Sequence, residues 1–148
     1  MKFLNFNPMK SIVTACLIFV LALSSACSNS SDNFIVGQET VSITAVDAPD
    51  TLIIGQRLVF KVSYNVPTTC HDFLRVNFSI EGKETTISIV TTIKEGNCNN
   101  LTNASQIVDV EAAPNEAGIF TFKFFTGFDS QGNPTFIVKE YDVAPRPI

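Results

Sequence analysis

The 148-residue chain has no tryptophan, one histidine and few basic residues, and each scarcity excludes a class of site. His71 stands alone, and neither a Cys-x-x-Cys nor a His-x-x-x-His spacing occurs, so no recognisable metal-ligand set is present. Lysine and arginine number 10 against 14 acidic residues, with no basic stripe. We therefore expect no metal, no cofactor and no nucleic-acid partner.

Long apolar runs are scarce as well. The main one, Ile12 to Leu23, has 12 residues, and a helix of that length rises about 18 Å against a hydrocarbon core of about 30 Å. Lys2 and Lys10 precede the run, and small residues follow it. A basic start, a short apolar core and small residues predict a secretory signal peptide over residues 1–26.

The stretch Ser24-Ser25-Ala26-Cys27 resembles the lipobox of bacterial lipoproteins, although Leu23 stands one position further from the cysteine than is usual. This resemblance implies lipidation of Cys27 and an outer-membrane protein, on the periplasmic or the cell-surface face. Two alternatives stay open. Val13-Thr14-Ala15-Cys16 also fits a lipobox, but only about five apolar residues precede it where about 7–15 are needed. An ordinary cleaved signal with an incidental cysteine is the other.

Beyond Cys27 the chain is acidic and long enough for one domain. Without Lys2 and Lys10, eight basic residues face 14 acidic ones, a net charge of −6. This charge argues against binding anionic lipid, so the acyl chains would provide the membrane attachment. Residues 27–40 are interpreted as the lipidated cysteine and a flexible tether, residues 41–144 as the domain, and residues 145–148 as a tail.

From residue 41 onward apolar residues recur with a period of two, which is typical of half-buried strands. Turn-forming residues separate the runs, and no helical pattern follows residue 27. Seven short strands predict an all-β sandwich. The expected core sets are Val41, Ile43, Ala45; Leu58, Phe60, Val62, Tyr64; Leu74, Val76, Phe78, Ile80; Ile87, Ile89, Ile93; Val108, Val110; and Phe120, Phe122, Phe124.

Two stretches resemble immunoglobulin-like (Ig-like) domains. NEAGIFTFKF, residues 115–124, resembles the turn into their strand F, with Phe120 where those domains place a tyrosine. VDAPDTLIIGQRLVFKVSY, residues 46–64, is similar to the A–B region of Ig-like modules in bacterial surface proteins. The resemblance implies an Ig-like β-sandwich of about seven antiparallel strands over residues 41–144.

Cys70 and Cys98 are the cysteines left in the domain, and outside the cytoplasm such a pair most often forms a disulfide. Closing a loop of about 29 residues would stabilise the fold by about 3–4 kcal/mol. The alternatives are a metal site that adds His71 and Asp72, or a Cys–His nucleophilic pair, although neighbours on an extended chain point apart. With no evident nucleophile and base, we expect no enzyme.

Loops at one end of such a sandwich commonly carry recognition. We therefore expect a lipid-anchored module for binding or assembly, whose partner is an envelope protein or a glycan. The strand assignment brings together three loops, over residues 67–72, 94–101 and 126–134. The candidate binding residues are Pro67, Thr68, Thr69, His71, Asn97, Asn99, Phe128 and Asp129.

Two further resemblances remain. NVPTTCHDF, residues 65–73, resembles the Asn-Pro-Thr-Thr-Gly loop of chagasin-type cysteine-protease inhibitors, which gives inhibition of such proteases as the alternative function. Asp50-Thr51-Leu52 resembles the Asp-Ser/Thr-aliphatic acceptor for O-glycosylation of bacterial envelope proteins, which makes Thr51 a candidate acceptor.

Overall fold

The computed structural model describes residues 34–145, and every regular element in that range is a strand. The described residues include no helix that is long and apolar enough to cross a membrane. The expected signal peptide, Cys27, the part of the expected tether up to residue 33, and residues 146–148 lie outside the described residues. The strands are β1 (Ile35–Val41), β2 (Ile43–Asp47), β3 (Leu58–Asn65), β4 (His71–Glu81), β5 (Glu84–Lys94), β6 (Ser105–Ala112), β7 (Gly118–Phe128) and β8 (Pro134–Val143).

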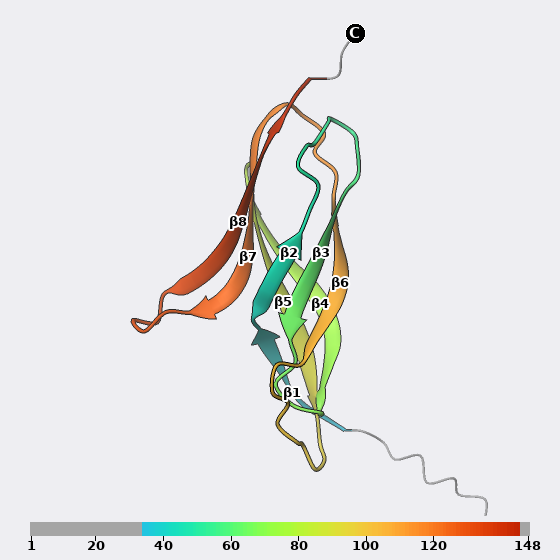
Figure 1. The fold of residues 1–148 in the computed structure, drawn as a ribbon, viewed down its shortest axis with the longest axis vertical. Helices are drawn as coiled ribbons and strands as arrows, with labels where there is room; N and C mark the ends of the chain where they lie inside the picture. Colours follow the sequence, from blue (N-terminus) through green and yellow to red (C-terminus); the bar gives the residue numbers. More distant parts are fainter. Residues whose placement is uncertain (1–33, 146–148) are drawn as a thin grey trace, which may run out of the picture. The chain divides into compact units, whose positions relative to one another are not determined.

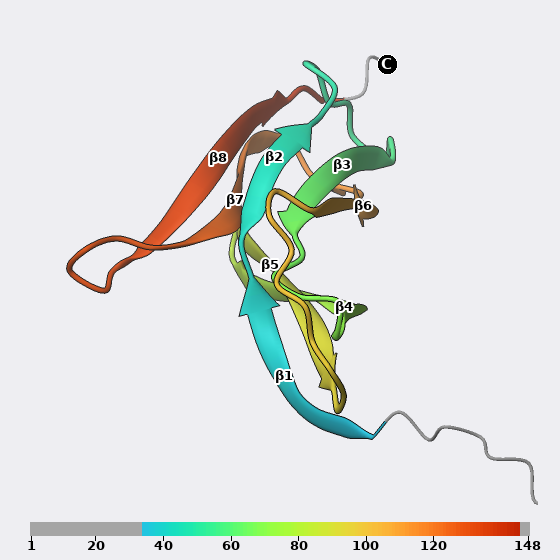
Figure 2. The ribbon, with the colours of Figure 1, turned by 60° about the horizontal axis from the view of Figure 1, so that its bottom comes forward.

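The strands form two sheets, which the two ribbon views show as separate layers (Figures 1 and 2). Sheet A has five strands: β1, β5, β7 and β8 in that order, with β4 paired to β5. Sheet B has three antiparallel strands in the order β2-β3-β6. Strand β1 belongs to sheet A and β2 to sheet B, so the chain passes between the sheets at Ser42.

The core lies between the sheets and centres on Phe60 of β3, which is fully buried. Its ring centroid lies 5.0 Å from Phe122 and 5.1 Å from Phe124, both on β7, and 6.0 Å from Tyr141 on β8. Tilted and edge-to-face contacts at these distances are the favoured geometry for aromatic rings. The expected all-β architecture and the buried face of residues 58–64 are thus confirmed.

The first strand begins earlier than the sequence indicated. Residues 35–40, interpreted as part of the tether, form most of β1 and pair antiparallel with β5. Most side chains of β1 are exposed, so buried and exposed positions do not alternate along this strand as they do along β3. Backbone pairing holds it in place, with a further bond from the Thr91 hydroxyl to the Glu39 carbonyl at 3.2 Å.

The expectation of about seven antiparallel strands is wrong in two respects. Residues 34–145 form eight strands, and β5 runs parallel to β7. The chain leaves β5 for β6 in sheet B before it returns as β7, and two reversals give β7 the direction of β5. Parallel neighbours require such a crossover, whereas a hairpin always gives antiparallel ones.

Strand β4 departs most from its expected burial. Its apolar residues were assigned to the core, yet Leu74 is 36% exposed, Phe78 50% and Ile80 69%. A bulge between Phe73 and Arg75 shifts Leu74 out of register, which removes it from the expected face. Beyond the bulge Phe78 and Ile80 do lie on the core side of sheet A, opposite Ile87 and Thr85 of β5. They are exposed because sheet B leaves them uncovered.

Candidate functional site

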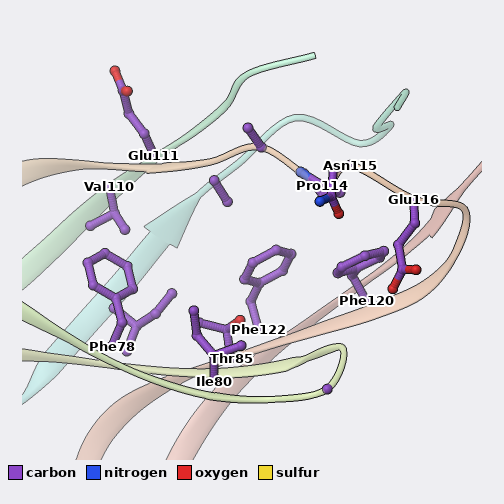
Figure 3. A pocket seen from close by; sticks show the side chains of 14 residues that line it. Phe78, Ile80, Thr85, Val110, Glu111, Pro114, Asn115, Glu116, Phe120 and Phe122 are labelled. Carbon is purple, nitrogen blue, oxygen red and sulfur yellow. The ribbon is translucent and has the colours of Figure 1, made fainter. Parts of the chain in front are cut away.

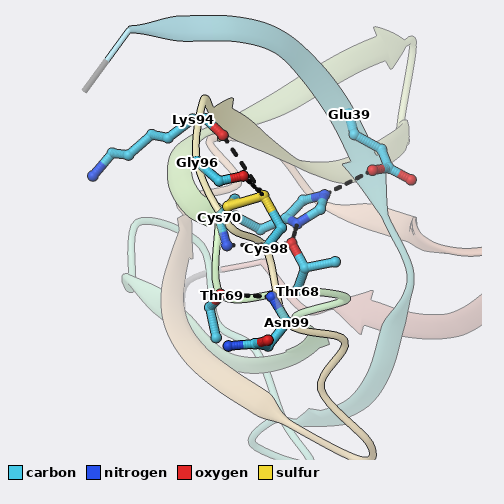
Figure 4. Close-up of a disulfide and its surroundings, with 9 residues drawn as sticks. Glu39, Thr68, Thr69, Cys70, Lys94, Gly96, Cys98 and Asn99 are labelled. Carbon is cyan, nitrogen blue, oxygen red and sulfur yellow. Dashed lines mark hydrogen bonds and ion pairs between the residues drawn. A yellow bond between two sulfur atoms is a disulfide. The ribbon is translucent and has the colours of Figure 1, made fainter. Parts of the chain in front are cut away.

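A disulfide joins the loop before β4 to the loop after β5 (Figure 4). Cys70 and Cys98 are bonded, with their Cα atoms 5.3 Å apart, which confirms the expected pairing. Because each sulfur is bonded to the other, neither is free to act as a nucleophile or a metal ligand. Within residues 34–145 no group of three or more His, Cys, Asp or Glu side chains could hold a metal ion.

Hydrogen bonds reinforce this link between residues 66–70 and 95–104, which we call the joined loops. Thr69 N–H donates to the Asn99 carbonyl at 3.0 Å, and Asn99 N–H donates to the Thr69 hydroxyl at 3.1 Å. Leu101 N–H donates to the Pro67 carbonyl at 2.9 Å. The disulfide and these bonds restrain both loops, so a ligand that bound them would order little further chain.

Most of the candidate residues on the joined loops are accessible. Thr69, Asn97 and Asn99 are exposed, whereas Pro67 and Thr68 are partly buried. The accessible groups are hydroxyls and side-chain amides, which both donate and accept hydrogen bonds. These candidate residues therefore suit a polar ligand, and Leu101 on the same loops, 36% exposed, adds one apolar side chain beside them.

His71 is buried, with 7% of its surface exposed, so its assignment as an accessible binding residue is wrong. Its Nε2 lies 2.8 Å from Oε2 of Glu39 on β1, and its Nδ1 lies 2.8 Å from the Thr68 hydroxyl. The carboxylate can only accept, so in the neutral ring Nε2 carries the proton and Nδ1 accepts from Thr68. His71 was placed in a loop, but it is the first residue of β4 and faces inward.

This trio has the order hydroxyl, imidazole, carboxylate that some hydrolases use for nucleophilic attack. Here the Thr68 oxygen also accepts the backbone N–H of Cys70 at 3.2 Å. Such a local bond is typical of a hydroxyl that shapes a turn. The trio connects β1, the loop before β4 and the start of β4, so its evident role is to fix the joined loops against β1.

Phe128 and Asp129, the candidates from the third loop, stand apart from the joined loops. They lie at the tip of the β7–β8 hairpin, which both ribbon views show well separated from the loop ends of β3 and β5 (Figures 1 and 2). The prediction that all three loops share one end is therefore wrong. Phe128 is 70% exposed, and its ring packs on Phe125 with centroids 5.2 Å apart.

Asp129 shapes the hairpin tip rather than offering a free carboxylate. The backbone N–H groups of Asn133 and Gln131 donate to one oxygen at 2.9 and 2.8 Å, and the Asn133 side-chain amide donates to the other at 3.1 Å. These bonds, those from Asn133 above all, lower the pKa of Asp129 below its ordinary value. The carboxylate is thus already engaged by the turn that follows it.

A comparison with protein-family models, curated proteins and solved structures found no match to this chain.

Sequence reasoning missed a groove between the edge of β6 and the β4–β5 hairpin, with a volume of about 460 Å³ (Figure 3). Phe122 and Ile87 contribute apolar side chains from β7 and β5. The close-up shows Phe78 on one side of the groove and Val110 on the other. Alternation in residues 74–80 indicated an apolar face, but the pattern alone could not show that this face would lack cover.

Lys83, at the turn between β4 and β5, fastens this hairpin to the loop before β7. Its Nζ donates to the Ala117 carbonyl at 2.6 Å and lies 5.5 Å from the centroid of the Phe120 ring. Gly82, beside it, has a φ of 62°, which a two-residue hairpin turn requires and glycine adopts without strain. One end of the groove is therefore held closed.

The burial of His71 predicts a structural effect on mutation. In His71→Ala both side-chain bonds are lost and a small cavity opens, so the free energy of unfolding should fall by about 2 kcal/mol. Asn97→Ala, at an exposed position in the joined loops, should change it by less than about 0.5 kcal/mol. Urea unfolding of the two variants beside the wild type measures both. Wild-type stability in His71→Ala would mean that this side chain is not held as described.

Proposed function

We propose that this protein is a lipid-anchored module of the bacterial outer membrane that binds an envelope protein or a glycan through the joined loops. The observation that carries the proposal is the rigid connection of two loops with an exposed polar surface. A disulfide and direct hydrogen bonds restrain residues 66–70 and 95–104, while Thr69, Asn97 and Asn99 remain exposed. Functional residues commonly sit on loops that a rigid scaffold positions.

We further propose that the domain is Ig-like in the broad sense of a two-sheet sandwich. The order β2-β3-β6 corresponds to strands A, B and E of an Ig sheet, and β7 with β8 corresponds to the antiparallel pair F and G. The pairings of β5 differ, since β5 lies between β4 and β7 where strands C and F of an Ig domain would be adjacent, and β1 also pairs with it. A fold of this kind is a scaffold and does not define the ligand.

Chain length relates the proposed anchor to the joined loops. Six residues separate Cys27 from Phe34, and the intervening backbone extends at most about 25 Å. The Phe34 carbonyl accepts the N–H of Glu95, in the second joined loop, at 2.8 Å. A lipid on Cys27 would therefore keep the joined loops close to the membrane, so the partner we propose is one found near the bilayer surface.

Exposed apolar side chains at the start of β1 agree with this position. Phe34, Ile35 and Val36 are between 61% and 66% exposed. Apolar side chains that follow closely after a lipid anchor can enter the interfacial region of a bilayer and add to the membrane affinity of the acyl chains.

Protease inhibition receives no comparable support. Chagasin-type inhibitors act through three loops, and the third candidate here, over residues 126–134, stands apart from the joined loops. Thr68, which matches the inhibitory loop in type, is partly buried and bonded to His71. A separate expectation concerns Thr51. Its side chain is exposed, as a glycosylation acceptor must be, and its O-glycosylation stays a prediction.

The anchor can be tested by labelling cells with a palmitate analogue. Wild-type protein should take up the label and partition with membranes, and Cys27→Ala should lose the label because the acyl acceptor is gone. Cys16→Ala is the matched control and should label normally. A label that survives in Cys27→Ala and disappears in Cys16→Ala would place the lipid on Cys16 and contradict the proposed anchor.

Partner binding can be tested with a photo-cross-linking amino acid in whole cells. At position 99, on the joined loops, it should give one discrete adduct, because a ligand bound there lies within reach of the side chain. Position 130, at the exposed hairpin tip, is the control and should give none. Mass spectrometry of the adduct distinguishes a protein from a glycan. Equal patterns at both positions, or no adduct at position 99, would contradict binding by the joined loops.

A further inference from the structure

Sheet B is one strand narrower than the part of sheet A that it faces. Where β5 pairs with β7, sheet A is four strands wide, in the order β4-β5-β7-β8, while sheet B has three strands. Phe78 and Ile80 point to the core side from β4, yet they are 50% and 69% exposed. A strand beside β6 would cover these two side chains, but none of the described residues occupies that position.

The edge of β6 that borders this position has free backbone groups. Val66 N–H donates to the Ala104 carbonyl at 2.9 Å, one step beyond Asn65 and Ser105, the last pair of the β3–β6 register. Hydrogen-bonded pairs alternate along an antiparallel ladder, so the even-numbered residues of β6 bond to β3. The N–H and C=O groups of Ile107, Asp109 and Glu111 therefore point to the open edge, where another strand could bond to them.

We propose that this groove binds an extended segment of another polypeptide, which adds to β6 as a fourth strand of sheet B and covers Phe78 and Ile80. Strand addition satisfies the free backbone groups of an edge and places alternate side chains in apolar sites. The groove fits such an occupant because its apolar wall runs beside the free edge (Figure 3). Lys83 holds one end closed, so the segment enters from the side, between β4 and β6.

Charge specifies the chemistry of the segment further. Among residues 34–145, the charged residues that line the groove are Glu111 and Glu116. Glu111 forms an ion pair with the exposed Arg57 at 2.9 Å, and Glu116 forms one with the partly buried Lys83 at 3.7 Å. Asp109 lies on the outer face of β6, and none of the described residues forms an ion pair with it. A fitting segment therefore alternates apolar residues, which face the groove, with lysine, arginine or neutral polar residues, which face outward.

A second copy of this chain fits the edge less well. Pairing two β6 edges would put Asp109 and Glu111 of both copies on one outer face of the extended sheet. Like charges at neighbouring positions across strands are destabilising. The proposal is independent of the joined loops, because residues 66–70 and 95–104 do not line the groove.

The test uses the purified protein and a synthetic peptide in which valine alternates with lysine and threonine, blocked at both ends. Binding measured by fluorescence anisotropy should saturate, and a peptide with glutamate in place of lysine should bind about tenfold more weakly. Asp109→Pro removes the edge N–H and should weaken binding about tenfold, whereas Asp109→Asn keeps this N–H and should weaken it only about threefold. The comparison of these two variants isolates the backbone bond from the charge.

A second pair of variants tests the apolar wall. Ile80→Ser should weaken peptide binding about tenfold, while Ile119→Ser should leave it unchanged. Ile119 has a similar exposure, 64%, and does not line the groove. No binding by the lysine peptide, or equal affinities of Asp109→Pro and Asp109→Asn, would overturn the proposal. Self-association of the protein that Asp109→Pro abolishes would also overturn it, in favour of a second copy.

Discussion

A three-stranded sheet cannot cover the face of a sheet that is four strands wide, and this mismatch determines what is buried and what is exposed. Phe60 lies where the two sheets overlap fully, and Phe122, Phe124 and Tyr141 surround it. Toward β4 the cover ends, so Phe78 keeps a core-facing orientation without a core around it. Apolar area left exposed forfeits about 25 cal/mol per Å², which is the free energy that a covering strand could recover.

The two proposed surfaces are built by different physical means. At the joined loops, the Cys70–Cys98 disulfide and the buried His71 restrain chain that carries exposed polar groups. Along β6, no restraint is needed, because an edge strand is already ordered and presents its backbone groups in a fixed row. The first surface suits recognition of a polar ligand, and the second suits an extended peptide.

Some of this arrangement could be predicted from the sequence. Strict alternation located the buried face of β3, and two cysteines in a domain expected outside the cytoplasm predicted the disulfide. Long-range pairing could not be predicted, because alternation shows which side of a strand is apolar but not which strands are neighbours. For this reason the sequence pattern does not reveal the strand at residues 35–40, the position of β5 beside β7, or the exposure of the apolar side chains of β4.

Hydrogen–deuterium exchange of the β6 amides tests the open edge most directly. The account predicts slow exchange for Val108 and Val110, whose N–H groups bond to β3, and fast exchange for Ile107, Asp109 and Glu111, whose N–H groups point to the empty position. NMR resolves these amides one by one in the protein without added peptide. Uniformly slow exchange along β6 would contradict the account, because it would mean that a strand already occupies this edge.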